Sequence, residues 1–306
     1  MLTVTMRLIK KSLASVLGTA ALASCGGGGS GGGSGSGSDA AVNQAPVAAA
    51  SISSAAVLNA QTSFDTSGTQ DPEGRIASRS WAYGDGQIGS TDAHIYTSTG
   101  IFTAVYTVTD DQGAAASKSL AVTVLKCSVA GTQAATLSPY PSVCMQTTKG
   151  ELVIEVYPAQ APATAANFLN YVDRGFYAGT LFHRVIPGFV VQGGGYLSGL
   201  TAKAPTDAAI VLESQNGLKN WQYTLAMARS TAANSATSQF FVNLVDNPSL
   251  DYSAAVAGAN GYAVFGQVIS GTAVIDQIAT APTATVGGFA DVPVTDIIIR
   301  GAVRMP

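Results

Sequence analysis

Hydrophobic residues are spaced in three different ways along the 306-residue chain. A mostly apolar run lies near the N-terminus, at residues 13–23. From residue 44 to residue 124, short β-branched and aromatic runs alternate with polar positions and are separated by Gly, Asp and Pro. After residue 144, alternating runs and runs with helical spacing both occur. Because alternation with period 2 indicates half-buried strands, the chain predicts a leader, an all-β domain and a mixed domain.

The first apolar run has the composition of an export signal. Arg7, Lys10 and Lys11 precede it, and it is too short to span a bilayer as a helix. We therefore expect residues 1–24 to be a signal peptide that is removed. Residues 26–38 contain only Gly and Ser, which cannot bury apolar surface, so 25–43 is expected to be a flexible linker.

The end of this leader indicates a membrane anchor. Leu22-Ala23-Ser24-Cys25 resembles the lipobox of bacterial lipoproteins, which implies that Cys25 is acylated and becomes the first residue of the mature chain. An ordinary secretory signal with an unrelated cysteine is the alternative. Gly26, rather than Asp, after this cysteine resembles outer-membrane sorting. The expected location is the cell envelope, with the protein lipid-anchored at the outer membrane and facing the periplasm.

The charge balance excludes several kinds of partner. The chain has 15 basic and 18 acidic side chains, and loss of the leader removes three basic ones and no acidic one. No block of Lys or Arg then remains that could neutralise a run of phosphates or hold an anionic membrane surface. We expect no nucleic-acid partner, and attachment to the membrane through acyl chains alone.

Residues 44–125 are predicted to form an all-β sandwich of short strands. Several segments resemble a PKD domain, which is an immunoglobulin-like sandwich. They are residues 43–46, 81–86 and 100–110, with His94 and Tyr96 between the last two. Trp81 is expected in the sandwich core, and His94 is expected to hydrogen-bond a loop. The resemblance implies a spacer or a protein-contact role for this domain.

Residues 126–306 are predicted to form a mixed α and β domain. Alternating apolar positions predict a strand at 151–156. A helix is expected to begin at Pro162 and to end near Gly175, and a shorter helix is expected at 272–279. Further strand-like runs lie at 239–245, 262–268 and 297–299.

The residue types exclude several chemistries. The chain has two histidines, one in each predicted domain, and no cluster of Cys and His, which argues against a transition-metal site. His183 is not accompanied by a Gly-x-Ser-x-Gly segment, and Gly193-Gly194-Gly195 lacks the spacing of a phosphate-binding loop. We therefore expect no metal, no cofactor, no serine hydrolase and no nucleotide site.

The segment 182–194, with the sequence FHRVIPGFVVQGG, closely resembles the signature segment of cyclophilins. Later segments agree in order and spacing, namely 227–229, 238–242, Leu250 and 262–266. The resemblance covers about half of the chain. It implies a closed eight-stranded antiparallel β-barrel capped by two α-helices, with the active face on its outer wall. It also implies peptidyl-prolyl cis-trans isomerase activity on proline-containing polypeptides.

The resemblance assigns roles to individual positions. It makes Arg184 the catalytic cation, Gln192 its orienting partner and Phe189 a wall of the proline pocket. The remaining substrate-binding positions are His183, Val190, Ala228, Arg229, Gln239, Phe241, Leu250 and Tyr262. Ala228 and Arg229 are expected to hold the peptide through their backbone. Phe240 is expected on the opposite face of its strand from Phe241.

Isomerisation requires a group that acts on the twisted bond. A peptide bond resists rotation by about 18 to 20 kcal/mol because its nitrogen lone pair is delocalised into the carbonyl. A guanidinium near the prolyl nitrogen donates a hydrogen bond to it once the bond twists, so the contact favours the transition state. Two alternatives stay open. Arg184 could instead form a surface ion pair, and the domain could be a non-catalytic protein that binds proline-containing peptides.

Two cysteines remain besides the acylated one. Cys127 and Cys144 form an even pair in a chain that is expected to be exported to an oxidising compartment. We expect a disulfide between them, with two buried free thiols as the alternative. The protein is expected to act as a monomer.

Overall fold

The fold was analysed in a computed structural model that describes residues 43–52, 56–255 and 260–306. The predicted signal peptide, the acylated Cys25 and the Gly/Ser linker lie outside the described residues. None of the helices in these three ranges is long and apolar enough to cross a membrane.

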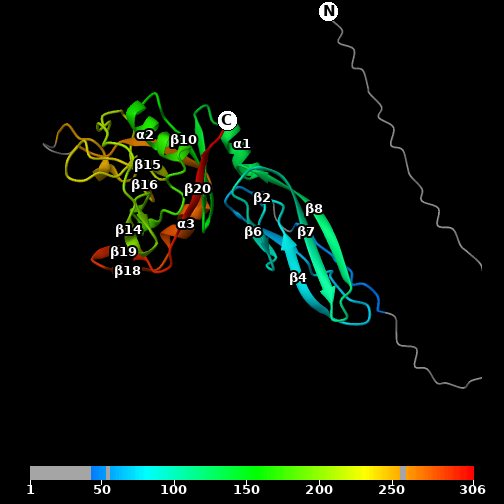
Figure 1. Cartoon of the computed structure of the whole chain (residues 1–306). Coiled ribbons are helices and arrows are strands. Elements are labelled where there is room, and N and C mark those ends of the chain that lie inside the picture. The colour runs from blue at the N-terminus through cyan, green and yellow to red at the C-terminus, as the bar shows by residue number, and fades with distance from the viewer. Residues whose placement is uncertain (1–42, 53–55, 256–259) are drawn as a thin grey trace, which may run out of the picture. The chain divides into compact units, whose positions relative to one another are not determined.

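The first domain is a sandwich of two sheets (Figure 1). The larger sheet has five strands in the order β2-β8-β7-β4-β5, and the smaller has three in the order β1-β3-β6. The strands are β1 (Ser51–Ile52), β2 (Ala56–Val57), β3 (Gln61–Asp65), β4 (Ile76–Ala82), β5 (Ile88–Gly89), β6 (Ala93–Ile95), β7 (Gly100–Asp110) and β8 (Ala115–Leu125). The prediction of an all-β sandwich in this part of the chain is confirmed.

Aromatic rings fill the space between these two sheets. Trp81, Tyr96 and Tyr106 are at most 1% exposed, and the Trp81 indole N–H donates to Asp92 Oδ1 at 2.9 Å. A buried Trp or Tyr usually finds such a partner for its polar atom. His94 Nε2 lies 2.7 Å from Oδ2 of Asp85, which belongs to a loop. His94 therefore hydrogen-bonds a loop, as predicted.

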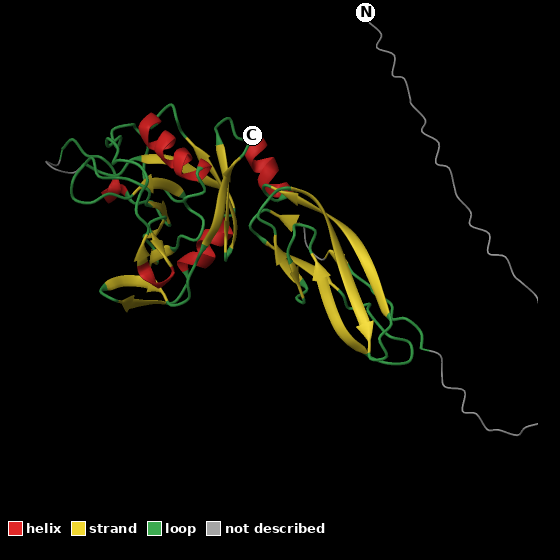
Figure 2. Ribbon diagram, in the orientation of Figure 1, coloured by secondary structure: helices red, strands yellow, loops and turns green. Residues whose placement is uncertain are grey.

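The second domain is built on an eight-stranded antiparallel sheet (Figure 2). Its strands follow the order β11-β12-β16-β15-β17-β10-β9-β20. Their bounds are β9 (Ser142–Thr147), β10 (Gly150–Val156), β11 (Phe182–Ile186), β12 (Val190–Gly193), β15 (Thr224–Met227), β16 (Phe240–Asn243), β17 (Val264–Ser270) and β20 (Ile299–Arg304). Two small hairpins, β13 (Tyr196–Leu197) with β14 (Thr201–Ala202) and β18 (Thr283–Val286) with β19 (Phe289–Pro293), extend from it.

The two edge strands of this sheet, β11 and β20, meet at one end only. Leu181 and Ile298 form an isolated bridge just before the strands begin. The pairing of β11 then has an irregularity between Phe182 and Arg184, and β20 has a matching one near its start. Such bulges bend a strand and interrupt its ladder. The sheet is therefore an open, curled half-barrel, and the prediction of a closed barrel is wrong.

Two helices cover the apolar face of the curled sheet, as the sequence predicts. Helix α2 (Pro162–Asp173) begins with Pro at its first position, and Gly175 follows it with a φ of +65°. Helix α3 (Thr272–Ala279) has the predicted bounds, and its Ile275 and Ile278 are buried in the same core cluster as Phe168 of α2. The sheet and the two helices thus enclose one hydrophobic core.

The described residues contain a third helix that the sequence pattern does not predict. Helix α1 (Val129–Leu137) starts after Ser128, whose Oγ accepts a hydrogen bond from Gly131 N–H at 3.0 Å. Cys127 and Cys144 are joined by a disulfide with a Cα–Cα distance of 5.9 Å, which ties the start of this helix to β9. The disulfide prediction is confirmed. Metal-ligand types gather in the described residues at Cys127, Cys144 and Glu151, but the two sulfurs are bonded to each other.

Candidate functional site

Three neighbouring strands, β11, β12 and β16, bring the predicted site residues together. Their antiparallel pairing sets Arg184 opposite Gln192, and Gln192 opposite Phe241. Since alternate residues of a strand face opposite sides of the sheet, Phe240 points into the core. Phe240 belongs to the large core cluster, whereas Phe241 belongs to a separate cluster on the outer wall. The predicted opposite orientation of these two rings is confirmed.

A hollow of about 170 Å³ lies on this outer wall. It is lined by Arg184, Phe189, Val190, Gln192, Ala228, Arg229, Phe241, Leu250 and Tyr262. Each of these residues was selected from the sequence, and they come from segments up to 78 residues apart that meet at one place. We call this hollow the proline pocket.

The floor of the proline pocket is apolar. Val190 and Phe241 are each 4% exposed and pack with the partly buried Phe189 and Leu250. The Phe241 and Tyr262 rings meet edge to face, with centroids 5.4 Å apart. A small apolar ring that enters this floor would replace water at the aromatic faces.

Arg184 supplies the cation at the edge of the pocket. Its side chain is 42% exposed, and its Nε lies 3.6 Å from Asp291 Oδ2 on β19. The ion pair that was an alternative from the sequence is therefore present, but the same residue also lines the pocket. Among the described residues, no hydrogen bond runs from the Arg184 guanidinium to the Gln192 side-chain amide. The amide Nε2 of Gln192 donates to Gln239 Oε1 at 2.9 Å.

Two predicted substrate-binding residues lie outside the proline pocket. Gln239 lines a neighbouring hollow together with Gln192, Ala228 and Arg229, so it contacts the site through the amide pair. His183 is 5% exposed, and its ring lies 4.6 Å from that of Tyr196. Burial lowers the pKa of His183 to about 4, and the neighbouring Arg184 adds to this effect. The imidazole is therefore neutral at pH 7.

The backbone groups beside the pocket are only partly free. Ala228 N–H donates to Gln239 C=O at 2.9 Å, so its carbonyl is the backbone group that remains for a peptide. The Arg229 side chain is fixed, because Nε donates to Gly261 C=O and the guanidinium carbon lies 4.7 Å above the Tyr262 ring. Arg229 thus shapes the pocket wall through its side chain.

Two residues at the site were missed by sequence reasoning. Asp291 pairs with Arg184 from a hairpin more than 100 residues later in the chain, and no local motif marks it. Asn247 is 6% exposed, and its amide donates to Phe189 C=O at 3.0 Å, which holds the backbone of the pocket wall. For Asn247, the available sequence signal was a polar residue between Leu244 and Leu250.

The fold and site define a class of protein with a curled eight-stranded sheet, two helices on its core face and a pocket of about 170 Å³ on its outer wall. The family described as cyclophilin type peptidyl-prolyl cis-trans isomerase/CLD matches residues 142–304, and the PKD domain family matches residues 43–124. The chain belongs to the cyclophilin-type peptidyl-prolyl cis-trans isomerase family, with a PKD domain before the isomerase domain. Both resemblances drawn from the sequence are confirmed.

Bacterial relatives match the second half of the chain. Peptidyl-prolyl cis-trans isomerase B of Escherichia coli K12 is 47% identical over 158 residues, which are 52% of this chain and 96% of that protein. A peptidyl-prolyl cis-trans isomerase of Acinetobacter baylyi is 51% identical over 49% of this chain and 77% of its own length. A solved cyclophilin type isomerase of Cryptosporidium parvum matches with a TM-score of 0.47 and 28% identity, over 54% of this chain and 99% of that one.

Proposed function

We propose that the second domain catalyses rotation about Xaa-Pro peptide bonds of exported polypeptides, with Arg184 as the catalytic cation. One observation carries this proposal. Arg184 and the apolar floor formed by Phe189, Phe241 and Leu250 line the same hollow. A proline ring on that floor would bring its nitrogen to the edge at which the cation lies.

The chemistry follows from what changes when the bond twists. The planar amide has a larger dipole than the twisted one, so an apolar pocket that removes water disfavours the planar form more. The Arg184 guanidinium then donates to the prolyl nitrogen, whose lone pair becomes localised at the twisted geometry. A rate gain of about 10⁵ requires roughly 7 kcal/mol from these effects together, and no covalent step is needed.

Asp291 and Gln192 would position this cation rather than react. Arg184 and Asp291 are both partly exposed, at 42% and 39%, and such pairs contribute at most about 1 kcal/mol. The substrate can therefore compete for the guanidinium. Gln192 lies directly across the strand pair from Arg184 and is itself held by Gln239, so it limits the orientations that the arginine can adopt.

The decisive experiment replaces the cation. In the mature chain, Arg184→Ala should lower kcat/KM for a tetrapeptide with one Xaa-Pro bond at least 100-fold. Arg174→Ala, which removes another exposed, ion-paired arginine of the same domain, is the matched control and should change kcat/KM by less than twofold. Equal activity of parent and Arg184→Ala would refute the catalytic role. No acceleration by the parent chain would favour the non-catalytic, peptide-binding alternative.

We further propose that Cys25 carries acyl chains that hold the protein at the outer membrane, facing the periplasm. The support is the lipobox-like segment 22–25, the Gly/Ser tract after it and the disulfide, which is typical of oxidising compartments. The PKD domain would serve as a spacer or docking module, and the isomerase domain would assist the folding of exported proteins.

A further inference from the structure

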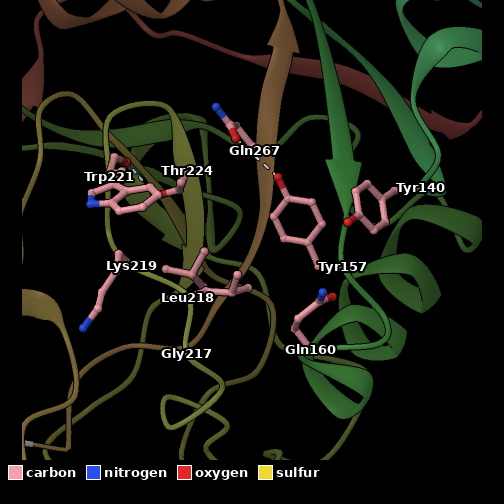
Figure 3. Close-up of a pocket in the computed structure, with 10 residues that line it drawn as sticks. Tyr140, Tyr157, Gln160, Gly217, Leu218, Lys219, Trp221, Thr224 and Gln267 are labelled. Carbon is pink, nitrogen blue, oxygen red and sulfur yellow. Dashed lines mark hydrogen bonds between the residues drawn. The ribbon is translucent and has the colours of Figure 1, made fainter.

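A second hollow, of about 260 Å³, lies on the isomerase domain and shares no lining residue with the proline pocket. Trp221 stands on one side of it and Tyr157 and Tyr140 on the other, with Leu218 between them (Figure 3). We call this hollow the aromatic cleft. The cyclophilin-like activity proposed above makes no use of it.

The aromatic cleft exposes the indole of Trp221. Trp221 is 63% exposed, whereas the other tryptophan of the chain, Trp81, is 1% exposed. The Tyr140 and Tyr157 rings meet edge to face at 4.9 Å and form a fixed wall opposite the indole. An exposed Trp opposite two half-buried Tyr rings marks a binding surface, because these side chains offer a large rigid apolar area together with polar atoms.

Hydrogen-bond donors at the cleft are still free. The Trp221 indole N–H, which is a donor only, and the Gln160 side-chain amide have no protein partner among the hydrogen bonds of the described residues. The Tyr157 hydroxyl is already used, because it donates to Glu155 Oε1 at 2.6 Å. The cleft therefore combines aromatic faces with donors that no protein acceptor occupies, and its ligand should offer acceptors that are free of internal hydrogen bonds.

One hydrophobic cluster contributes lining residues to both the cleft and the proline pocket. Leu218 and Val264, which line the cleft, belong to the same hydrophobic cluster as Phe241 and Leu250 of the pocket. An extended chain that enters the pocket can therefore continue along the outer wall of the sheet. An anionic ligand is disfavoured, since Lys219 at the cleft is paired with a carboxylate at 3.5 Å.

We propose that the aromatic cleft binds a proline-rich segment, in polyproline II conformation, of the same polypeptide whose Xaa-Pro bond is isomerised. The inference rests on the proposed isomerase function and specifies its substrates further. A polyproline II segment has no internal hydrogen bonds, so its carbonyls are free to accept from Trp221 and Gln160. Its rings pack on aromatic grooves, and its stiffness reduces the entropy lost on binding.

The kinetic test uses three peptides with the same isotope-labelled Xaa-Pro bond, followed by NMR exchange. The first peptide is the tetrapeptide alone. The second carries six prolines and the third six serines, each joined to the tetrapeptide by a short Gly-Ser spacer. Both extended peptides are made in two versions, with the extension on the N-terminal or on the C-terminal side. For the parent, kcat/KM should be at least fivefold higher with one of the six-proline peptides than with the matching six-serine peptide. Trp221→Ala should abolish the preference and leave tetrapeptide turnover within twofold. Ile101→Ala, which truncates a 76% exposed residue of the PKD domain, should preserve the preference.

Indole fluorescence tests the cleft without relying on catalysis. Because Trp221 is the exposed tryptophan and Trp81 is buried, binding at the cleft should shift the emission of the chain to shorter wavelength. The shift should occur with the six-proline peptide in the parent and in Arg184→Ala, and should be absent in Trp221→Phe. Three results would overturn the proposal. The first is a parent that shows neither the kinetic preference nor the emission shift, and the second is an equal shift with the six-serine peptide. The third is an equal loss of kcat/KM on all peptides in Trp221→Ala. An inactive parent that still shows the shift would refute the isomerase function alone.

Discussion

At the scale of single residues, His183 and Arg184 are adjacent in sequence but lie in different surroundings. Phe182 and Val185 both point into the core, which strict alternation of a strand does not allow. The irregularity between Phe182 and Arg184 accounts for this, because it makes His183 an extra residue that folds inward. Arg184 therefore reaches the pocket, and His183 is buried beside Tyr196.

The buried histidine should make stability depend on pH. The pKa of His183 is about 4 in the folded protein and 6.5 when the imidazole is free in water, as in the unfolded chain. Between pH 6.5 and 4 the unfolded chain therefore binds more protons than the folded protein. The free energy of unfolding should then fall as the pH decreases through this window, by up to about 3 kcal/mol from this residue. Urea unfolding at pH 7, 6, 5 and 4.5 measures the effect.

His183→Gln is the control for this pH effect, because all carboxyl groups are common to both proteins. The parent should lose more stability than the variant on acidification. Parallel curves would show that the imidazole is not desolvated. Peptide turnover should stay flat from about pH 7 to 9 in both, because neither the neutral His183 nor the arginine changes its charge there.

The residues of the proline pocket could be predicted because all nine lie in segments that resemble the family, and four of the nine lie on short strands. Alternation along β12 and β16 then fixes which side chains reach the outer wall, as Val190 and Phe241 do. His183 could not be placed, because a bulge has no signature in the hydrophobic pattern. The pairing of Arg184 with Asp291 depends on a distant hairpin, which only the folded chain brings close.

At the scale of elements, α3 could be located from its apolar stripe, whereas α1 could not. Only Gly131 and Ala135 of α1 are buried, so its sequence lacks a stripe that would predict it. Its position depends instead on the Ser128 cap, on the carboxylate of Glu151 and on the disulfide. The open edge of the sheet was missed as well, since no hydrophobic pattern marks the irregularities of β11 against β12 and of β20 against β9.

The disulfide should contribute most of the stability of this corner of the domain. It closes a loop with a sequence separation of 17, which corresponds to about 3 kcal/mol on the chain-entropy model. The double variant Cys127→Ala, Cys144→Ala should lose this amount in urea unfolding, while peptide turnover at 25 °C stays within twofold. A reductant should destabilise the parent and leave the double variant unchanged. An unchanged unfolding midpoint in the double variant would contradict the expected contribution.

At the scale of the whole molecule, the two largest core clusters of the described residues follow one another along the chain. The change from short alternating runs to mixed periodicity after residue 144 could be read from the sequence, because each core imposes its own spacing of apolar residues. The leader and linker carry no such pattern. The proposed functions of the leader and the linker rest on their residue types, so the location of the protein is tested by experiment.

An acidic mature chain has no electrostatic attraction to an anionic membrane, so a membrane location requires covalent lipid. In a bacterium that processes lipoproteins, the full chain should incorporate labelled palmitate and sediment with the outer membrane. Cys25→Ser should incorporate no label and remain in the soluble fraction, with unchanged isomerase activity per molecule. If the parent also proves soluble and unlabelled, the leader is an ordinary secretory signal. If the parent is labelled but sediments with the inner membrane, Gly26 does not direct sorting as proposed.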